Sequence, residues 1–467
     1  MLFSSSIFLF LFLPLVILGY QLLKGKVRIY FLTLASLFFY AWGEPKYILV
    51  MLFSIALNYA SGLCLNACGD RTRRRNIVLA LSVISNLGVL FYYKYLGFTV
   101  ASVNQLLHTS IPVRNIVMPI GISFFTFQGM SYVIDLYLGN VRVQKNPAYI
   151  AFYISFFPQL IAGPIVRYID IQDQIYARNE SIERFTEGAQ RFIIGLAKKV
   201  ILANTVGYAA DQIFSGPAIS NTPSTAWLGV LCYAFQIYFD FSGYSCMAIG
   251  LGKMFGFDFL ENFKYPYISK TVTEFWRRWH ISLSTWFRDY LYIPLGGNRR
   301  GNVYVNLSIV FLVTGIWHGA SMNFIVWGLW FGLWLILERL TKTGKVEKGL
   351  HIPLRWAMTM LIVLVGWVLF RADNLSEAMR YLGIMFGFLK PENVVFTVRY
   401  YLTNRIILAL LLSLIASLPL FKSKWASKIT ARPFWRPVSL VLSLVLFFVS
   451  IVFVCASSYN PFIYFRF

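Results

Sequence analysis

The chain has 467 residues, of which 58% are hydrophobic and only 13% are charged. Soluble globular domains carry about 25% charged residues, so this composition excludes a soluble protein. Lysine and arginine number 42 against 19 acidic residues, which gives a formal net charge of +23. The basic residues lie between apolar runs, as in the cytoplasmic loops of membrane proteins. The positive charge therefore does not indicate nucleic-acid binding.

The first third of the chain predicts membrane spans with a defined direction. Met1–Tyr20 is apolar but lacks the basic start and the small-residue cleavage site of a signal peptide, so we interpret it as the first span. Basic loops at Lys24–Arg28 and Arg71–Arg75 are expected on the cytoplasmic side, which places the N-terminus outside. Spans near Asn76–Gly97 and Val117–Leu138 then bring the chain back to the cytoplasmic side.

The next apolar segment, Pro147–Pro164, is barely long enough to span a membrane and is broken by Pro158 and Gly163. Irregular backbone at membrane depth is tolerated only where it is buried in protein or lines a cavity. We therefore expect a re-entrant or tilted segment near a site. The polar stretch Arg167–Arg191 that follows is expected at the cytoplasmic surface.

The second half predicts an amphipathic layer between groups of spans. After spans near Phe192–Ile213 and Ala226–Leu251, the region Lys253–Arg300 interleaves tryptophan and tyrosine with arginine, as in helices at headgroup level, and we place it on the cytoplasmic side. Five more spans complete about twelve crossings. We expect an all-α polytopic membrane protein with one domain over residues 1–467. These last spans lie near Val303–Ala320, Met322–Leu340, Pro353–Phe370, Ile406–Leu420 and Val438–Val454.

The candidates for chemistry are few. His108 and His351 fall in predicted loops, where a solvated histidine needs no special explanation. All five cysteines lie in or beside apolar runs and form no CxxC pair or Cys/His cluster. We expect buried thiols and no metal site.

His318 is the strongest candidate because it lies in the apolar run IVFLVTGIWHGASMNFIVWGLW. An ionisable side chain at membrane depth is costly and indicates function, although a structural histidine bonded across helices is the alternative. His280 lies in the aromatic and basic layer, where the alternative is an interfacial histidine. A neutral imidazole in a low-dielectric cavity can take a proton from a hydroxyl, so either histidine could act as a general base.

Several motifs in order resemble the membrane-bound O-acyltransferase family, and within it the alginate-type members of its bacterial polysaccharide branch. They cover nearly the whole chain. The motifs are MPIGISFFTFQ at residues 118–128, AGPIVRY at 162–168, QIYFDFSGYS at 236–245, TEFWRRWHISLSTWFRDYLYIPLGGNRRG at 273–301 and GIWHGA at 315–320.

The resemblance implies the helical fold of this family and an acyltransferase in a bacterial inner membrane. It implies transfer from a cytoplasmic thioester, acetyl-CoA in this branch or another acyl thioester, to a hydroxyl acceptor on the far side. The enzyme would hold no bound cofactor, and a periplasmic or membrane-anchored esterase-like partner would carry acetyl to the polysaccharide. His318 matches the essential histidine of the family, and His280 matches a second histidine near the donor path.

The residues around the histidines fit these roles. The layer offers a cationic surface for the phosphates of an acyl-CoA donor, and four polar residues are candidates to orient the base or hold an oxyanion. The candidate donor-binding residues are Trp276, Arg277, Arg278, Arg288, Arg299 and Arg300, and the candidate orienting residues are Asp240, Thr314, Ser321 and Asn323.

One position departs from the family pattern. Cys246 stands where the pattern FSGYSD has an acidic residue, and a thiol cannot replace its charge, although Asp240 could compensate. Alternative hypotheses are D-alanyl transfer or acylation of a lipid by the same fold, which the thioester consumed would distinguish. A transporter is a third hypothesis, because an intramembrane histidine and a broken helix also occur in transporters.

Overall fold

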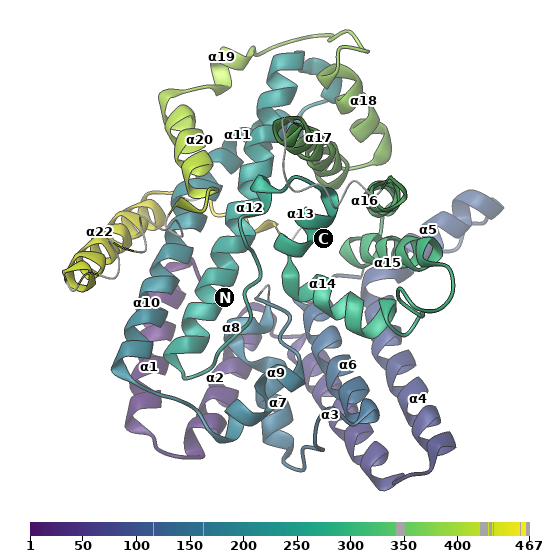
Figure 1. The fold of residues 1–467 in the computed structure, drawn as a ribbon, viewed down its shortest axis with the longest axis vertical. Helices are drawn as coiled ribbons and strands as arrows, with labels where there is room; N and C mark the ends of the chain where they lie inside the picture. The colour runs from purple at the N-terminus through teal and green to yellow at the C-terminus, as the bar shows by residue number, and fades with distance from the viewer. Residues whose placement is uncertain are drawn as a thin grey trace. The chain divides into compact units, whose positions relative to one another are not determined.

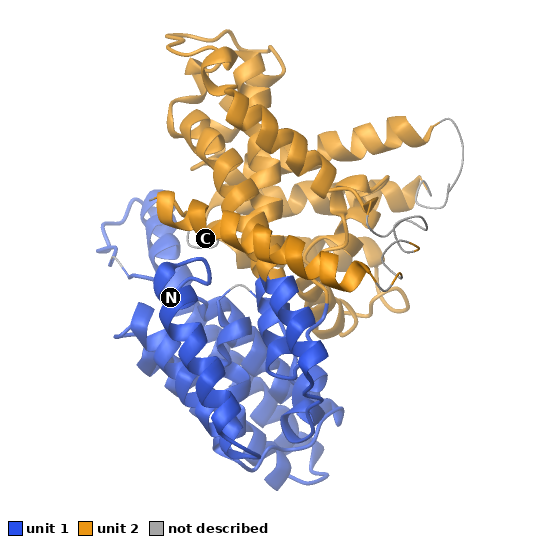
Figure 2. Ribbon diagram, turned by 90° about the vertical axis from the view of Figure 1, so that its left-hand side faces the viewer, with its two compact units in different colours: residues 1–192, 247–260 blue, residues 193–246, 261–467 orange. Residues whose placement is uncertain are grey.

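The computed structural model describes residues 1–114, 116–161, 163–341, 351–420, 428, 432, 434–457 and 459–463, and the regular elements among them are all helical (Figure 1). The chain divides into two compact units, residues 1–192 with 247–260 and residues 193–246 with 261–467 (Figure 2). Helices α10 (Ile182–Ala197) and α12 (Pro223–Met254) each contribute residues to both units. The single domain expected over residues 1–467 stays a prediction.

The predicted all-α membrane architecture is confirmed in its coarse form. Within the described residues, six helices are long and apolar enough to cross a bilayer, and four apolar helices are shorter. The count of about twelve crossings stays a prediction. The six are Ile48–Ala67, Thr72–Leu107, Ile182–Ser215, Met322–Leu340, Ile352–Arg371 and Trp435–Ala456, and the shorter four are Phe8–Leu22, Val27–Gly43, Val303–His318 and Asn404–Ala416.

Unit 1 is built around aromatic side chains. Phe8, Phe39 and Phe157 are fully buried, and their ring centroids lie 5.6 to 6.2 Å apart. Such ring pairs stabilise a core beyond their buried area. Its helices are η1 (Phe8–Phe12), α1 (Leu13–Leu22), α2 (Val27–Gly43), α3 (Ile48–Ala67), α4 (Thr72–Leu90), η2 (Phe91–Tyr95), α5 (Leu96–Leu107), α6 (Ile122–Leu138), α7 (Pro147–Ser155), α8 (Phe157–Leu160), α9 (Tyr168–Tyr176) and the first part of α10.

The interruption expected near Pro158 is present in unit 1. Helix α7 ends at Ser155, and α8 begins at Phe157 with Pro158 in its first turn, where proline costs no hydrogen bond. The Phe157 backbone N–H donates instead to the Ser36 hydroxyl, at 3.1 Å. The re-entrant course of this segment stays a prediction, and Ala162 of the AGPIVRY motif lies outside the described residues.

Unit 2 is organised around α12, which is apolar on all sides and is buried along most of its length, as expected for a core helix. Its other helices are η3 (Lys198–Ala203), α11 (Asn204–Ser215), η4 (Ala218–Ser220), η5 (Pro266–Ile268), α13 (Val272–Arg278), α14 (Ile281–Phe287), η6 (Arg288–Tyr292), α15 (Val303–His318), α16 (Met322–Leu340), α17 (Ile352–Arg371), α18 (Leu375–Met385), α19 (Val398–Tyr401), α20 (Asn404–Ala416) and α22 (Trp435–Ala456).

Glycines allow α15 and α16 to pack backbone to backbone. A Cβ atom on Gly315 would overlap the carbonyl oxygen of Phe324, and one on Gly328 would overlap that of Phe311. Helices that approach this closely require small residues at the crossing. The crossing fixes the C-terminal end of α15, where His318 is the last residue.

The predicted amphipathic layer contains, within unit 2, the short helices α13 and α14 and the π-helix η6. Thr271 caps α13 by accepting the Glu274 backbone N–H at 2.9 Å, and the Glu338 carboxylate of α16 accepts from the Thr273 N–H at 2.9 Å. A carboxylate at a helix N-terminus is stabilising. These contacts fix α13, and with it the start of α14, to α16.

The expectation of buried thiols is correct for Cys232 and wrong for Cys64 and Cys455, which are exposed. An apolar run predicts a membrane helix, but such a helix can turn its side chains toward lipid as readily as toward protein. Hydropathy alone therefore does not predict which face a cysteine occupies.

Candidate active site

The two candidate histidines, His280 and His318, line the same buried cavity in unit 2. The cavity measures about 20 Å³, which is enough for about one water molecule. The rest of its wall is almost entirely aromatic or aliphatic. The other lining residues are Ile237, Phe241, Trp279, Trp327, Trp367, Phe370 and Ile463.

His318 is held among aromatic rings. It ends α15, because Gly319 leaves the helix with extended backbone, and its side chain is 7% exposed. The rings of Trp327 and Phe370 stand nearly perpendicular to the imidazole, with centroids 4.9 and 5.1 Å away. These rings shield the imidazole from bulk water and fix its plane.

His280 lies between α13 and α14 with a left-handed backbone, at φ 44°. Non-glycine residues rarely adopt this conformation, and it is typical of constrained positions at functional sites. The side chain is 1% exposed, and the Phe241 ring stands perpendicular to it at 4.6 Å. The strained turn thus directs this imidazole into the core.

Asn262 fixes the proton of His280. Its Oδ1 atom accepts the backbone N–H of Ser282 at 3.1 Å, and it also lies 3.2 Å from Nδ1 of His280. A backbone N–H can only donate, so the Asn262 atom is the carbonyl oxygen, and Nδ1 of His280 must carry the proton. The lone pair of the neutral imidazole therefore lies on Nε2.

Burial also keeps His280 uncharged. His280 lies outside the candidate spans, and desolvation by burial lowers the pKa of its imidazole to about 3. A charged imidazole is disfavoured in such surroundings. At neutral pH, His280 is thus a hydrogen-bond acceptor through Nε2.

Asp240 does not line the cavity, but it holds one wall of it. The carboxylate lies 2.6 Å from Lys199 Nζ, both side chains are 3% exposed, and its other oxygen accepts the Ile463 backbone N–H at 2.8 Å. Lys199 also donates to the Pro461 carbonyl. This buried ion pair fastens residues 459–463 against α12, and Ile463 closes the cavity.

The other candidate orienting residues are bound elsewhere. Thr314 donates to the Val310 carbonyl of its own helix at 2.7 Å, and the Ser321 hydroxyl donates to Asn323. Asn323 donates to the Ala372 carbonyl at 2.8 Å and so ties α16 to the end of α17. None of the three is among the residues lining the cavity. Of these contacts, only the Asn323 bond joins two helices, and it positions the end of α17 near Phe370.

The candidate donor-binding residues divide by exposure. Arg277, Arg288, Arg299 and Arg300 are exposed, whereas Arg278 is half-buried, pairs with Glu274 at 2.8 Å and donates to the Lys264 carbonyl. Trp276 is buried, with the Trp327 ring 5.7 Å away. Trp276 therefore packs behind the cavity wall, and the tryptophans of the layer are buried while most of its arginines are not.

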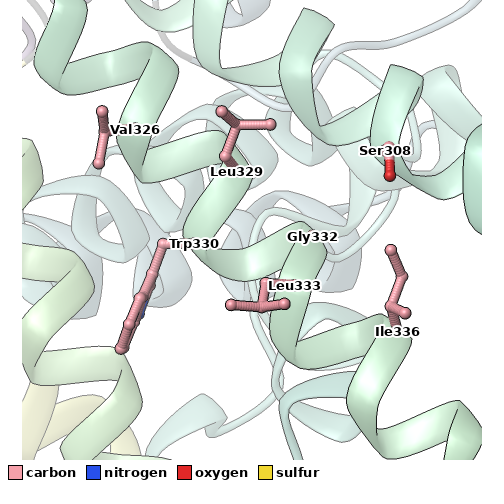
Figure 3. Close-up of a pocket in the computed structure, with 7 residues that line it drawn as sticks. All are labelled: Ser308, Val326, Leu329, Trp330, Gly332, Leu333 and Ile336. Carbon is pink, nitrogen blue, oxygen red and sulfur yellow. The ribbon is translucent and has the colours of Figure 1, made fainter.

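A second cavity, on the α15–α16 hairpin, offers no comparable chemistry (Figure 3). It measures about 410 Å³, and its lining is aliphatic except for Trp330 and the hydroxyl of Ser308. No titratable side chain lines it. The histidine cavity is thus the candidate active site.

Comparison with known proteins decides the family. The sequence model described as MBOAT, membrane-bound O-acyltransferase family, matches residues 47–344, more than half of the chain. The chain belongs to the membrane-bound O-acyltransferase family. It is accordingly an acyltransferase and a multi-pass membrane protein. The match contains both His280 and His318.

Three relatives indicate the branch of the O-acyltransferase family to which the chain is most similar. The chain is 42% identical to the probable alginate O-acetylase AlgI of Pseudomonas putida over 100% of both chains. It is 48% identical to the probable alginate O-acetylase AlgI of Pseudomonas aeruginosa over 83% of this chain and 75% of that protein. It is 37% identical to the peptidoglycan O-acetyltransferase of Helicobacter pylori over 83% of this chain and 80% of that protein. The predicted resemblance to the AlgI-like branch is confirmed.

Cys246, which replaces the acidic residue of the family pattern, contacts a lysine. Lys198 Nζ lies 3.4 Å from its sulfur. Asp240 is engaged with Lys199 and does not take over this contact. A thiol is a weak acceptor, so this contact is a weak hydrogen bond, whereas a carboxylate at position 246 could form an ion pair with Lys198.

The residues that the sequence did not single out are Asn262, Lys199, Trp327 and Ile463. Asn262 lies in an irregular stretch between α12 and α13. Lys199 lies in η3, next to Lys198, and in the sequence the pair resembles the charges of a loop. The one feature of the sequence that could have indicated Lys199 is its position beside the apolar run that follows it. Nothing in the local sequence links residues 459–463 to the histidines.

Proposed function

We propose that this enzyme is an O-acetyltransferase for an exported, alginate-type polysaccharide. It takes acetyl from cytoplasmic acetyl-CoA and passes it across the bacterial inner membrane to a hydroxyl group. The acceptor is a periplasmic or membrane-anchored esterase-like partner that acetylates the polysaccharide. The observation that carries this proposal is the cavity that His280 and His318 share. The probable alginate O-acetylase and the peptidoglycan O-acetyltransferase among the relatives support the acetyl group and the polysaccharide.

The proposed topology has about twelve crossings, with both termini outside and a re-entrant segment at Pro147–Pro164. The positive-inside rule then places the layer of α13, α14 and η6 on the cytoplasmic side. Its exposed arginines, Arg277, Arg288, Arg299 and Arg300, would face the aqueous phase that contains acyl-CoA. Guanidinium groups bind phosphates with paired hydrogen bonds, so they suit the nucleotide end of the donor.

Within the cavity, His318 would act as the general base. The acceptor hydroxyl transfers its proton to the His318 imidazole while its oxygen attacks the thioester carbonyl. The carbon–sulfur bond then breaks, and the thiolate leaves and takes up that proton. Trp327 lines the cavity, and its indole N–H has no hydrogen-bond acceptor within the described residues, so this N–H is a candidate to stabilise the carbonyl oxygen.

His280 would position the reacting groups. Because Asn262 holds its proton on Nδ1, Nε2 can accept a hydrogen bond from the acceptor hydroxyl or from a bound water. The cavity of about 20 Å³ is too small for an acetyl thioester. Wall side chains must therefore move apart when the donor enters, and the closed wall limits access of water to the histidines when no donor is bound.

The test is acetyl transfer by the purified protein in lipid nanodiscs, with radiolabelled acetyl-CoA as donor and the co-purified partner as acceptor. His318→Ala is expected to lower the rate at least about 1,000-fold, within the range for removal of a general base. His351→Ala, at an exposed histidine, is the matched control and should retain the wild-type rate. A folded His318→Ala protein with undiminished transfer would refute the proposed role.

The donor assay also separates the alternatives. D-alanyl transfer or acylation of a lipid would consume a different thioester or label a lipid in the same nanodiscs. A transporter would move solute without consuming thioester. The proposal requires acetyl-CoA consumption that depends on His318.

A further inference from the structure

A third cavity of unit 2 lies away from the histidines, between η3 and α11 on one side and the ends of α20 and α22 on the other. We call it the α20–α22 crevice. It measures about 610 Å³, within the range of about 300–1,000 Å³ that is common for small-molecule sites. Its lining combines tyrosines, amides and aliphatic groups with one arginine. The lining residues that bear on its function are Asn204, Tyr208, Gln212, Tyr400, Arg405, Phe453 and Tyr459.

The crevice lies where headgroups are expected. Helix α22 has 22 residues and is apolar enough to cross a membrane, and at 1.5 Å per residue it is about 33 Å long, which matches the hydrocarbon core. The crevice takes residues from the C-terminal end of α22 and the N-terminal end of α20. Tyr208 and Tyr400 are half exposed beside it, and tyrosine is typical of the membrane interface.

The crevice has the charge to bind an anion. Among the described residues that line it, Arg405 is the one charged side chain. The guanidinium lies 5.6 Å from the Phe453 ring centroid and forms no ion pair within the described part of the chain. Asn204, Gln212 and Thr403 add hydrogen-bonding groups around it. An arginine beside neutral polar groups suits a phosphate ester that also carries hydroxyl groups.

The crevice also has an apolar side that opens toward lipid. Only 6% of the apolar window of α22 is buried by protein, and Phe453 and Ala456 of this helix line the crevice together with Val200 and Ile406. A soluble phosphate compound would leave this surface uncovered. We propose that the α20–α22 crevice binds one phospholipid, with its phosphate on Arg405 and its glycerol on the amides.

The bound lipid would support the wall of the histidine cavity. Tyr459 lines the crevice, and its hydroxyl donates to Asp211 at 2.6 Å, which in turn pairs with Arg371 at 2.9 Å. Four residues later, Ile463 lines the histidine cavity. The two sites therefore share one short segment, residues 459–463. A lipid bound in the crevice would hold Tyr459, the N-terminal end of that segment, in place. An effect of the lipid on acyl transfer would rest on the proposed function.

The experiment is native mass spectrometry of the full chain purified in detergent and supplied with phosphatidylglycerol. The wild type is expected to retain one phospholipid per chain, and Arg405→Gln should lower that occupancy about tenfold, the loss expected for one charge-assisted hydrogen bond. Arg405→Lys should retain part of it. Arg399→Gln, at an exposed arginine outside the crevice, is the matched control and should retain all of it.

Equal retention by Arg405→Gln and the wild type would overturn the proposal. Displacement of the lipid by soluble glycerol 3-phosphate would also overturn it and assign the site to a soluble phosphate ester. Should Arg405→Gln not fold, a photoreactive phosphatidylglycerol bound to the wild type decides the matter, because labelling is expected within residues 400–406 or 453–457 and labelling elsewhere refutes it. These measurements need no acyl transfer, so their failure is separate from failure of the proposed function.

Discussion

The two histidines reach one cavity from regions that hold them in different ways. His280 itself adopts a strained left-handed backbone, and a hydrogen bond to Asn262 fixes its side chain. His318 ends a regular helix and is enclosed by the rings of Trp327 and Phe370. Hydrogen bonds fix the tautomer of an imidazole, whereas ring packing fixes its plane and shields it from bulk water. The fixed tautomer suits the positioning role proposed for His280.

The largest effect is expected from the ion pair that holds the cavity wall. Asp240→Asn leaves Lys199 as an unpaired buried charge and should lower the free energy of unfolding by about 3–5 kcal/mol. The thermal midpoint of the purified protein measures this loss. Adding Lys199→Met to Asp240→Asn removes the lone charge and keeps an acceptor for the Ile463 N–H, so most stability should return. A stable Asp240→Asn protein would show that the wall does not depend on this pair.

Asn262→Ala tests whether His280 works through its fixed tautomer. Loss of this acceptor should lower kcat about 10- to 100-fold, the value of one to two buried hydrogen bonds. Combined with His280→Gln it should cost no more than His280→Gln alone, because both changes remove one function. Ser282→Ala removes the hydroxyl that also donates to Asn262 Oδ1 at 2.9 Å but keeps the backbone N–H and the His280 contact, so it is the matched control and should change kcat little. If the losses in kcat of the two single variants multiply in the double variant, Asn262 does not act through His280.

The buried neutral state of His280 predicts a pH-dependent stability. Its pKa falls from 6.5 to about 3 on folding, so below pH 6.5 the unfolded chain binds a proton that the folded protein does not, and stability falls as pH falls through this window. At pH 5.5 the loss is up to about 1.4 kcal/mol. Unfolding midpoints at pH 7.5 and 5.5 should differ more for the wild type than for His280→Gln. His351→Gln, at an exposed site, should behave as the wild type.

The smallest effect is expected at Cys246, outside the cavity. Cys246→Asp would place a carboxylate beside Lys198 and raise stability by about 1 kcal/mol or less, as for a partly exposed ion pair. The thermal midpoint checks this change, and Lys198→Gln should abolish the gain. A gain that survives in the Lys198→Gln background would place the partner of the aspartate elsewhere.

The sequence predicted the elements of the site better than their contacts. His318 in an apolar run, the small residues around it and the short aromatic and basic layer are each visible in a local window, and both histidines do line one cavity. Thr314, Ser321 and Asn323 were equally close in sequence to His318, yet their hydrogen bonds go to helix carbonyls and to each other. Proximity along the chain does not predict where a side chain points, because a helix turns successive residues to different faces.

What the sequence by itself determined is the class of the protein. Hydropathy predicts the helices because a bilayer requires each backbone polar group to be bonded within its own segment, and the ordered motifs predict the family. Only the tertiary structure decided what surrounds the histidines. Asn262 meets His280 across 18 residues, and Asp240 meets Ile463 across 223. Such pairings depend on how the whole core packs, since no local energy term favours them until the helices are in place.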